Sequence, residues 1–231
     1  MNKNIVIAGN KSWNKSFLEE LLSATGQNII MITKAEELNY ENLVKLDLRY
    51  IFFFHWSNLI PAEIYENFEC VIFHMTDVPF GRGGSPLQNL IARGIYETKL
   101  TALKCVKDLD AGPVYLKKSL SLHGNAEEIY LRATRLSAEM MLEILSKEII
   151  PEEQKGEPTI FKRRKPEEGN IVGKDNLQEI YDFIRMLDAE GYPRAFLNIG
   201  KINLEFERAA LKDGYIKADV TIRLRGAEEH E

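Results

Sequence analysis

The stretch CVIFHMTDVPFGRGGSPLQ, residues 70 to 88, holds the side chains best suited to chemistry in this sequence. His74 ends a short apolar run, and a glycine-rich turn with Arg82 and Gly83 follows it. Glycine lets a ligand approach the backbone closely, and an imidazole titrates near neutral pH. The stretch therefore predicts a site that binds an anion or moves a proton. The glycine-rich turn is a weak signal by itself, because it matches no standard phosphate-binding motif.

Two other polar residues are candidates for the same site. His55 follows a second apolar run, and Asp110 lies in the turn KDLDAG, residues 107 to 112. Active sites in open parallel sheets gather beyond the carboxyl ends of the strands, which is where both histidines are expected. A histidine at a strand end is equally often structural, and an aspartate in such a turn usually only forms the turn. Position alone does not decide between these roles.

The elements that must position these residues alternate between strands and helices. Strands are predicted over residues 4–9, 28–33, 48–57, 69–74, 99–106 and 112–120. Helices are predicted from Ser16, from Ser85 and from near Asn125. This alternation favours an α/β fold, with a Rossmann-like, mostly parallel sheet and helices on both faces.

Two of the predicted helices carry clear start and stop signals. Ser85 is a candidate N-cap before Pro86, and Gly94 lies where a left-handed C-terminal residue is wanted. The long helix begins near Asn125, with Glu128 three residues on and Pro151 beyond its end, and the helix from Ser16 has a capping box of Ser16 and Glu19.

The composition changes after residue 150, which suggests a domain boundary. We predict a catalytic domain over 1–155, a connector over 156–175 and a small subdomain over 176–231. The last segment is rich in alternating and β-branched residues, so a strand-rich appendage is expected there.

Charge and composition narrow the classes of partner. The 231 residues carry a formal net charge of −5, which disfavours a long nucleic acid. Cys70 and Cys105 both lie in apolar runs, so buried free thiols in a reducing compartment are expected. No apolar run reaches membrane-spanning length, and no residues have the spacing of zinc ligands. A cytoplasmic protein without membrane or metal is predicted.

Taken together, the motifs resemble the folate-dependent formyltransferases, a family that includes methionyl-tRNA formyltransferase, glycinamide ribonucleotide transformylase and the sugar-nucleotide N-formyltransferases. The family pattern HPSLLPxxRGxxP is matched by His74, Pro79, Arg82, Gly83 and Pro86. Its DxG motif is matched by Asp110 and Gly112. The segments FKRRKPEEGNI and FIRMLDAEGYPRAF are similar to C-terminal motifs of the sugar enzymes. The resemblance covers residues 50 to 200.

The resemblance implies formyl transfer from N10-formyltetrahydrofolate to an amine. His74 would stabilise the oxyanion or manage the proton, and Asp110 would orient the imidazole. The pterin would be read mainly by the backbone of the loop from Leu103 to Asp110. The residues that would bind the donor are Leu103, Lys104, Val106, Asp108, Arg82 and Gly83.

One departure from the family lies two residues before His74. The family has an asparagine there that donates to the oxyanion, and this chain has Ile72. Loss of such a donor typically costs about 2.7–4 kcal/mol of transition-state stabilisation. Our hypothesis is that His55 takes its place, with Asn58 as the second candidate.

Within the family, the form of the glycine-rich segment resembles enzymes of nonulosonic acid biosynthesis, the pseudaminic and legionaminic acid type. By that similarity the acceptor would be a sugar nucleotide, a UDP-linked 4-amino-4,6-dideoxy-N-acetylhexosamine. The candidates for binding it are Asn10, Lys11, Thr76 and Asp77. Two alternatives stay open. One is an enzyme like methionyl-tRNA formyltransferase, and the other is a catalytically impaired protein that binds folate or a sugar.

Overall fold

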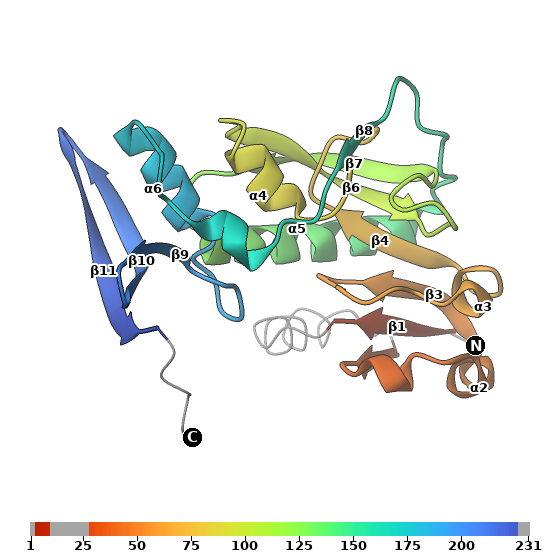
Figure 1. The fold of residues 1–231 in the computed structure, drawn as a ribbon. Helices are drawn as coiled ribbons and strands as arrows, with labels where there is room; N and C mark the ends of the chain where they lie inside the picture. The colour runs from red at the N-terminus through yellow and green to blue at the C-terminus, as the bar shows by residue number, and fades with distance from the viewer. Residues whose placement is uncertain (1–2, 10–27, 226–231) are drawn as a thin grey trace. The chain divides into compact units, whose positions relative to one another are not determined.

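The computed structural model describes residues 3–9 and 28–225, whose fold is traced in Figure 1. The chain divides into two compact units. The first comprises residues 1–83, 98–120 and 131–160, and the second comprises residues 84–97, 121–130 and 161–231. The chain therefore passes between the two units several times.

The first unit is built on a six-stranded sheet of order β2-β1-β3-β4-β6-β7. Its strands are β1 (Asn4–Ala8), β2 (Ile29–Ile32), β3 (Leu48–Phe53), β4 (Cys70–His74), β6 (Glu97–Lys104) and β7 (Val114–Ser121). Strands β2, β1, β3 and β4 run parallel, and β6 runs antiparallel to β4. The predicted mostly parallel sheet is confirmed.

Both faces of this sheet are covered at its central strand β1. Successive side chains of a strand point to opposite faces, and Ile5, Val6, Ile7 and Ala8 of β1 are all fully buried. A strand buried on both faces is a continuous apolar run, which is how this segment reads in the sequence. The carboxyl ends of β1, β3 and β4 share one sheet edge, and His74 is the last residue of β4.

The remaining elements of this unit are short, apart from one long helix. They are η1 (Ala35–Glu37), α2 (Tyr40–Leu43), η2 (Val44–Leu46), α3 (Ala62–Tyr65), most of α5 (Ala126–Lys147), β5 (Phe80–Gly83) and the start of β8 (Thr159–Phe161). Strands β5 and β8 pair in a separate two-stranded sheet. The predicted connector thus contributes a strand to the glycine-rich turn, which its polar composition did not indicate.

Two predicted elements differ in extent or cannot be compared. The aromatic strand was expected to reach residue 57, but β3 ends at Phe53. The backbone of His55 has a φ of 48°, in the left-handed region, and this conformation cannot continue a strand. The helix predicted from Ser16 lies outside the described residues.

The second unit contains α4 (Pro86–Ile91), η3 (Pro166–Gly169), α6 (Leu177–Arg185) and an antiparallel sheet of order β11-β10-β9. The strands are β9 (Ala195–Ile199), β10 (Ile202–Lys212) and β11 (Tyr215–Leu224). The predicted strand-rich C-terminal appendage is confirmed. Asn176 caps α6 by accepting a hydrogen bond from the Glu179 N–H at 2.8 Å.

Helix α4 begins at Pro86, as predicted, but the Ser85 side chain does not cap it as expected. Ser85 has a φ of 49° and makes no side-chain cap bond. Its hydroxyl oxygen instead accepts a hydrogen bond from the Arg164 N–H at 3.0 Å. The serine is therefore used to hold residues far along the chain. Gly94 has a φ of 70°, as a left-handed helix terminus requires.

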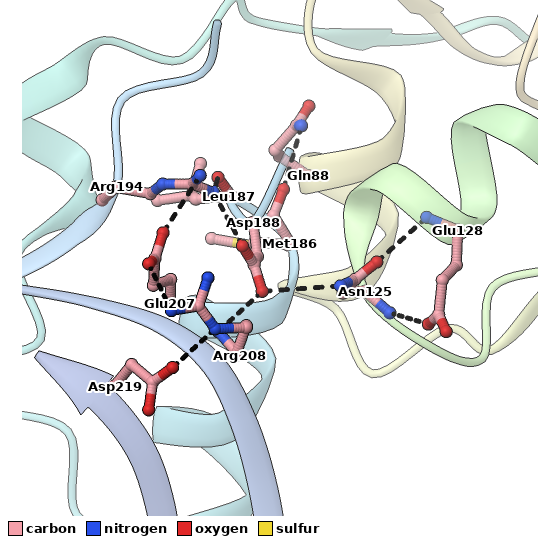
Figure 2. Close-up of polar contacts among 10 residues, drawn as sticks. All are labelled: Gln88, Asn125, Glu128, Met186, Leu187, Asp188, Arg194, Glu207, Arg208 and Asp219. Carbon is pink, nitrogen blue, oxygen red and sulfur yellow. Dashed lines mark hydrogen bonds and ion pairs between the residues drawn. The ribbon is translucent and has the colours of Figure 1, made fainter. Parts of the chain in front are cut away.

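Asp188, in the turn after α6, collects three donors (Figure 2). Its carboxylate accepts from Arg194 Nη1 at 2.7 Å, from the Arg208 N–H at 2.8 Å and from Asn125 Nδ2 at 3.5 Å. Asn125 and Glu128 form a capping box at the start of α5, with both bonds at 2.9 Å. One carboxylate thus joins this turn to Asn125, the residue before α5, and to Arg208 of β10.

Candidate active site

His74 and Asp110 converge in the first unit. His74 Nδ1 lies 3.4 Å from Asp110 Oδ2, although 36 positions separate the two residues. The residues are only 8% and 7% exposed, so bulk water screens the contact little. The expectation that these two side chains meet is confirmed. The geometry provides an imidazole held against a carboxylate, which is an arrangement suited to proton transfer or to stabilising negative charge.

The other edge of the imidazole is held by the glycine-rich turn. His74 Nε2 lies 2.8 Å from the carbonyl oxygen of Gly81. A carbonyl oxygen only accepts hydrogen bonds, so Nε2 carries the proton in this arrangement. The Thr76 hydroxyl donates to the same carbonyl at 3.2 Å. The ring therefore presents a defined N–H on the side of the turn.

Asp110 is fixed by its backbone as well as by its partners. Its φ is 53°, which is uncommon for a residue other than glycine. Its Oδ2 accepts a hydrogen bond from the Gly83 N–H at 2.9 Å, so the aspartate contacts both the imidazole and the glycine-rich turn. A Cβ atom on Gly112 would lie 1.9 Å from the Lys104 carbonyl oxygen. Only glycine fits there, which explains the glycine of the DxG motif.

Gln154 is a residue that the sequence motifs did not indicate. Its Nε2 donates to the carbonyl oxygens of Asp110 and Gly112, both at 2.8 Å. Its Oε1 accepts from Arg82 Nε at 3.0 Å and from Arg82 Nη2 at 2.8 Å. The side chain thus connects the glycine-rich turn to the DxG turn. Nothing in the polar segment around Gln154 singles it out.

The residues predicted to bind the donor take several positions. Leu103 is fully buried in β6, and Lys104 Nζ forms an ion pair of 2.8 Å with Glu69. Val106 is half-buried and Asp108 is exposed, both in the loop that leads to Asp110. Arg82 donates to Gln154, and the Gly83 N–H donates to Asp110. The donor-binding roles of all six residues stay predictions.

The residues predicted to bind the acceptor are also spread out. Asn10 and Lys11 lie outside the described residues. Thr76 is fully buried and supports the turn, whereas Asp77 is exposed and pairs with Lys117 Nζ at 2.6 Å. Asp77 also lines an open pocket of about 650 Å³. This pocket includes Lys117 and Gln154, and its size is in the range of small-molecule sites.

The side chain of His55 contacts helix α5. Its Nε2 lies 2.9 Å from Thr134 Oγ1. Ile72, which stands where the family has an asparagine, packs against the apolar core that contains Cys70. The side chain at 72 therefore has an apolar structural role, and the donor role of His55 stays a prediction.

Both cysteines are free and buried, as expected. Burial, together with the nearby Asp110 carboxylate, raises the pKa of the Cys105 thiol to about 11 from 9.0. Burial also raises the pKa of Cys70. The pKa of Cys105 is higher in the folded than in the unfolded state. Burial of its protonated thiol therefore contributes to stability below pH 9, and that contribution is lost as the pH rises toward 11.

We predict that Cys105 of the native protein reacts about a hundredfold more slowly with iodoacetamide at pH 8 than a thiol of pKa 9, because the thiolate fraction is smaller by that factor. Mass spectrometry after timed alkylation measures the rate, and Cys105→Ser assigns it. Denaturant should restore ordinary reactivity. Fast alkylation of Cys105 without denaturant would contradict the prediction.

Among the residues that the structure describes, no helix is long and apolar enough to cross a membrane. In the same part of the chain, no group of three or more His, Cys, Asp or Glu side chains is placed to hold a metal ion.

Comparison with known proteins identifies the family. Residues 166–223 match the family model described as methionyl-tRNA formyltransferase, C-terminal domain. The curated methionyl-tRNA formyltransferase of Thermodesulfovibrio yellowstonii is 26% identical over 166 residues, which are 67% of this chain and 54% of that protein. The chain spans between about half and two thirds of the length of the first curated relatives it matches.

Solved structures give a finer comparison. The formyltransferase PseJ from Anoxybacillus kamchatkensis, in complex with a UDP-linked formamido sugar and tetrahydrofolate, is 15% identical with a TM-score of 0.57. That match covers 69% of this chain and 85% of that one, and it shows a shared fold only. The structure of methionyl-tRNA formyltransferase from Clostridium thermocellum is 50% identical with a TM-score of 0.94, over 96% of this chain and 99% of that one. At that identity and coverage, the chain belongs to the formyltransferase family that includes methionyl-tRNA formyltransferase.

Proposed function

We propose that this chain transfers a formyl group from N10-formyltetrahydrofolate to a primary amine. The contact of His74 Nδ1 with Asp110 Oδ2 carries the proposal, because it pairs an acid–base side chain with a carboxylate in a member of a formyltransferase family. The structure of PseJ with tetrahydrofolate supports the choice of formyl donor.

In this reaction the amine nitrogen attacks the formyl carbon, and the formyl oxygen becomes an oxyanion. The bond from the formyl carbon to N10 of the folate then breaks, and one proton passes overall from the amine to N10. The Nε2–H of His74, which donates a hydrogen bond to the Gly81 carbonyl in this structure, is a donor for that oxyanion. An anionic oxygen is a stronger acceptor than a carbonyl, so it can replace the Gly81 oxygen.

Asp110 acts on the other edge of the ring. When the imidazole is cationic, its second proton is on Nδ1, which faces Asp110 Oδ2, and the carboxylate stabilises the positive charge. The Gly83 N–H and the left-handed backbone of Asp110 hold the carboxylate in place. Preorganised groups of this kind lower the barrier because they need not reorient as charge develops.

The oxyanion also needs a replacement for the missing asparagine, and His55 remains our candidate. Its Nε2 is in contact with Thr134 Oγ1, so donation from this atom requires the ring to exchange that partner. We expect that exchange to take place only when the substrates bind.

We propose methionyl-tRNA as the acceptor, in place of the sugar nucleotide that the sequence favoured. The methionyl-tRNA formyltransferase of Clostridium thermocellum is 50% identical to this chain over nearly its whole length, whereas PseJ is 15% identical. The overall charge of −5 was the argument against a nucleic acid. Residues 159–225 hold 13 Lys and Arg against 11 Asp and Glu, so the acidic excess lies elsewhere in the chain and weakens that argument.

The test presents the purified chain with N10-formyltetrahydrofolate and one acceptor at a time. Methionyl-tRNA should be formylated, and deacylated tRNA and a UDP-linked 4-amino sugar should not. Formylation of the sugar alone would overturn the acceptor and keep the reaction class. Folate binding with no turnover on any acceptor would overturn the reaction and favour a binding protein.

Gln154 offers a separate prediction about positioning. Gln154→Leu should lower kcat about tenfold and change KM little, because the Asp110 loop loses two hydrogen bonds worth about 0.5–1.5 kcal/mol each. Gln154→Glu keeps an acceptor for Arg82 but has no N–H for the two carbonyls, so its kcat should fall similarly. Steady-state kinetics of both variants measure this. A Gln154→Glu enzyme with normal kcat would show that the loop does not depend on these bonds.

A further inference from the structure

The indole N–H of Trp56 is a buried donor without an acceptor. Its Nε1 is covered from solvent and has no hydrogen-bond partner among the residues that the structure describes. Buried N–H groups are almost always paired, because a donor left without an acceptor carries the cost of its lost hydration. Nε1 is the one polar atom of the indole ring, and it only donates. An acceptor atom from outside the chain would satisfy it.

In the described part of the chain, one other buried side-chain atom is in the same situation, which is Nη2 of Arg185. The fold accounts for that atom. Nε and Nη1 of the same guanidinium make hydrogen bonds, and the group lies 5.2 Å from the centroid of the Tyr96 ring. The guanidinium is therefore stabilised within the protein. Trp56 has no second polar atom that could compensate in this way.

Trp56 lies on the face of the sheet that carries His74. Phe53 of β3 pairs with Ile72 of β4, so these two side chains point to one face. His74 is two residues beyond Ile72 and points to the same face. The indole of Trp56 packs edge-on against Phe53, with ring centroids 6.0 Å apart and ring planes at 65°. The indole is thus placed on the His74 side of the sheet, where β3 and β4 end.

The loop that leads to Asp110 starts from the same place. Trp56 and Ile72 both pack against an apolar core that includes Cys70 and Cys105. Cys105 directly follows β6, and its N–H donates to the Cys70 carbonyl at 2.8 Å. It is also part of the loop over residues 103–110 in which the formyl donor is predicted to bind. The unpaired N–H and the predicted donor-binding loop therefore border one core.

We infer that Trp56 is a binding residue for the formyl donor, and that its indole N–H donates a hydrogen bond to an acceptor atom of the folate. This role rests on the proposed function and adds a residue to its site. It also fits the departure at position 72, where Ile72 cannot donate and the family has an asparagine. The indole, packed on the strand neighbour of Ile72, supplies an N–H on the same face.

The N–H is covered in this structure, although the Trp56 side chain as a whole is only partly buried. We expect the ring to shift when the folate binds. The acceptor atom belongs either to the formyl group or to the rest of the folate. N10-formyltetrahydrofolate carries both, whereas tetrahydrofolate lacks the formyl group, so a comparison of the two ligands distinguishes them.

Isothermal titration calorimetry of the full chain with each ligand, in the absence of an amine acceptor, measures Kd without turnover. Trp56→Phe removes the N–H and keeps an aromatic ring. It should weaken the binding of N10-formyltetrahydrofolate about tenfold, which is the effect of one hydrogen bond lost in a buried site. An equal loss with tetrahydrofolate would assign the acceptor to the shared part of the folate. A loss confined to the formylated ligand would assign it to the formyl oxygen.

Phe53→Leu is the matched control, because it disturbs the packing of the indole and leaves its N–H in place. Its Kd should stay within about twofold of the native value, with a native circular dichroism spectrum in both variants. Equal losses of affinity in the two variants would mean that packing matters and the N–H does not, which would overturn the inference. So would an unchanged Kd in Trp56→Phe. A native chain that binds neither folate would instead overturn the proposed function, and this role with it.

Discussion

His74→Gln is expected to lower kcat for formyl transfer by about 10²- to 10⁴-fold, which is the usual contribution of a positioned acid–base group. The glutamine amide can still donate to the Gly81 carbonyl, so the turn is preserved. It cannot take up a proton, and it cannot carry the positive charge that Asp110 stabilises. A quenched assay with the proposed donor and acceptor measures kcat, and the affinity for folate should change little.

Asp110→Asn separates the charge of the carboxylate from its geometry. An amide oxygen can still accept from the Gly83 N–H, but the negative charge beside His74 Nδ1 is lost. We expect kcat to fall in this variant too, with little further loss when it is combined with His74→Gln, because residues that act as a unit are not additive. A His74→Gln enzyme with near-normal kcat would remove the imidazole from the mechanism.

Arg185→Met is expected to lower the free energy of unfolding by about 3–5 kcal/mol, the range found when one partner of a buried ion pair is removed. Arg185 is 2% exposed and its Nε donates to Asp182 Oδ1 at 2.6 Å. Its Nη1 donates to the carbonyls of Leu122 and Gly124 at 2.6 and 2.8 Å. Methionine would leave the Asp182 carboxylate and both carbonyls without these donors. Urea unfolding followed by circular dichroism measures the change.

Arg208→Met is the matched control for this prediction. The Arg208 side chain is 64% exposed and its ion pairs with Glu207 and Asp219 are open to solvent. Exposed pairs contribute little, so its unfolding free energy should stay close to that of the native chain. If Arg185→Met and Arg208→Met had equal effects, burial would not be what makes the Arg185 pair important. Arg185 lies in the segment FIRMLDAEGYPRAF, so this prediction gives that motif a structural role.

The sequence by itself determined the elements and the central pair of the site. Apolar runs such as Ile5–Ala8 specify strands buried on both faces, because burial of that surface is available only within a covered sheet. The capping box of Asn125 and Glu128 is equally local. His74 and Asp110 could be singled out because the motifs around them, taken together, resemble those of the folate-dependent formyltransferases, and the structure brings the two side chains into contact.

Only the tertiary structure decided which polar groups hold that pair. Gln154 meets Arg82 and the DxG turn across more than forty positions, and no local pattern encodes such a contact. Serine is a common N-cap residue, but the hydroxyl oxygen of Ser85 accepts a hydrogen bond from the main-chain N–H of Arg164 instead of capping α4. Strand β8 has only three residues, Thr159–Phe161, within a polar segment, and it pairs with β5. In each case the hydrogen bond is made by whichever group the fold brings near, and the order of residues along the chain does not specify that group.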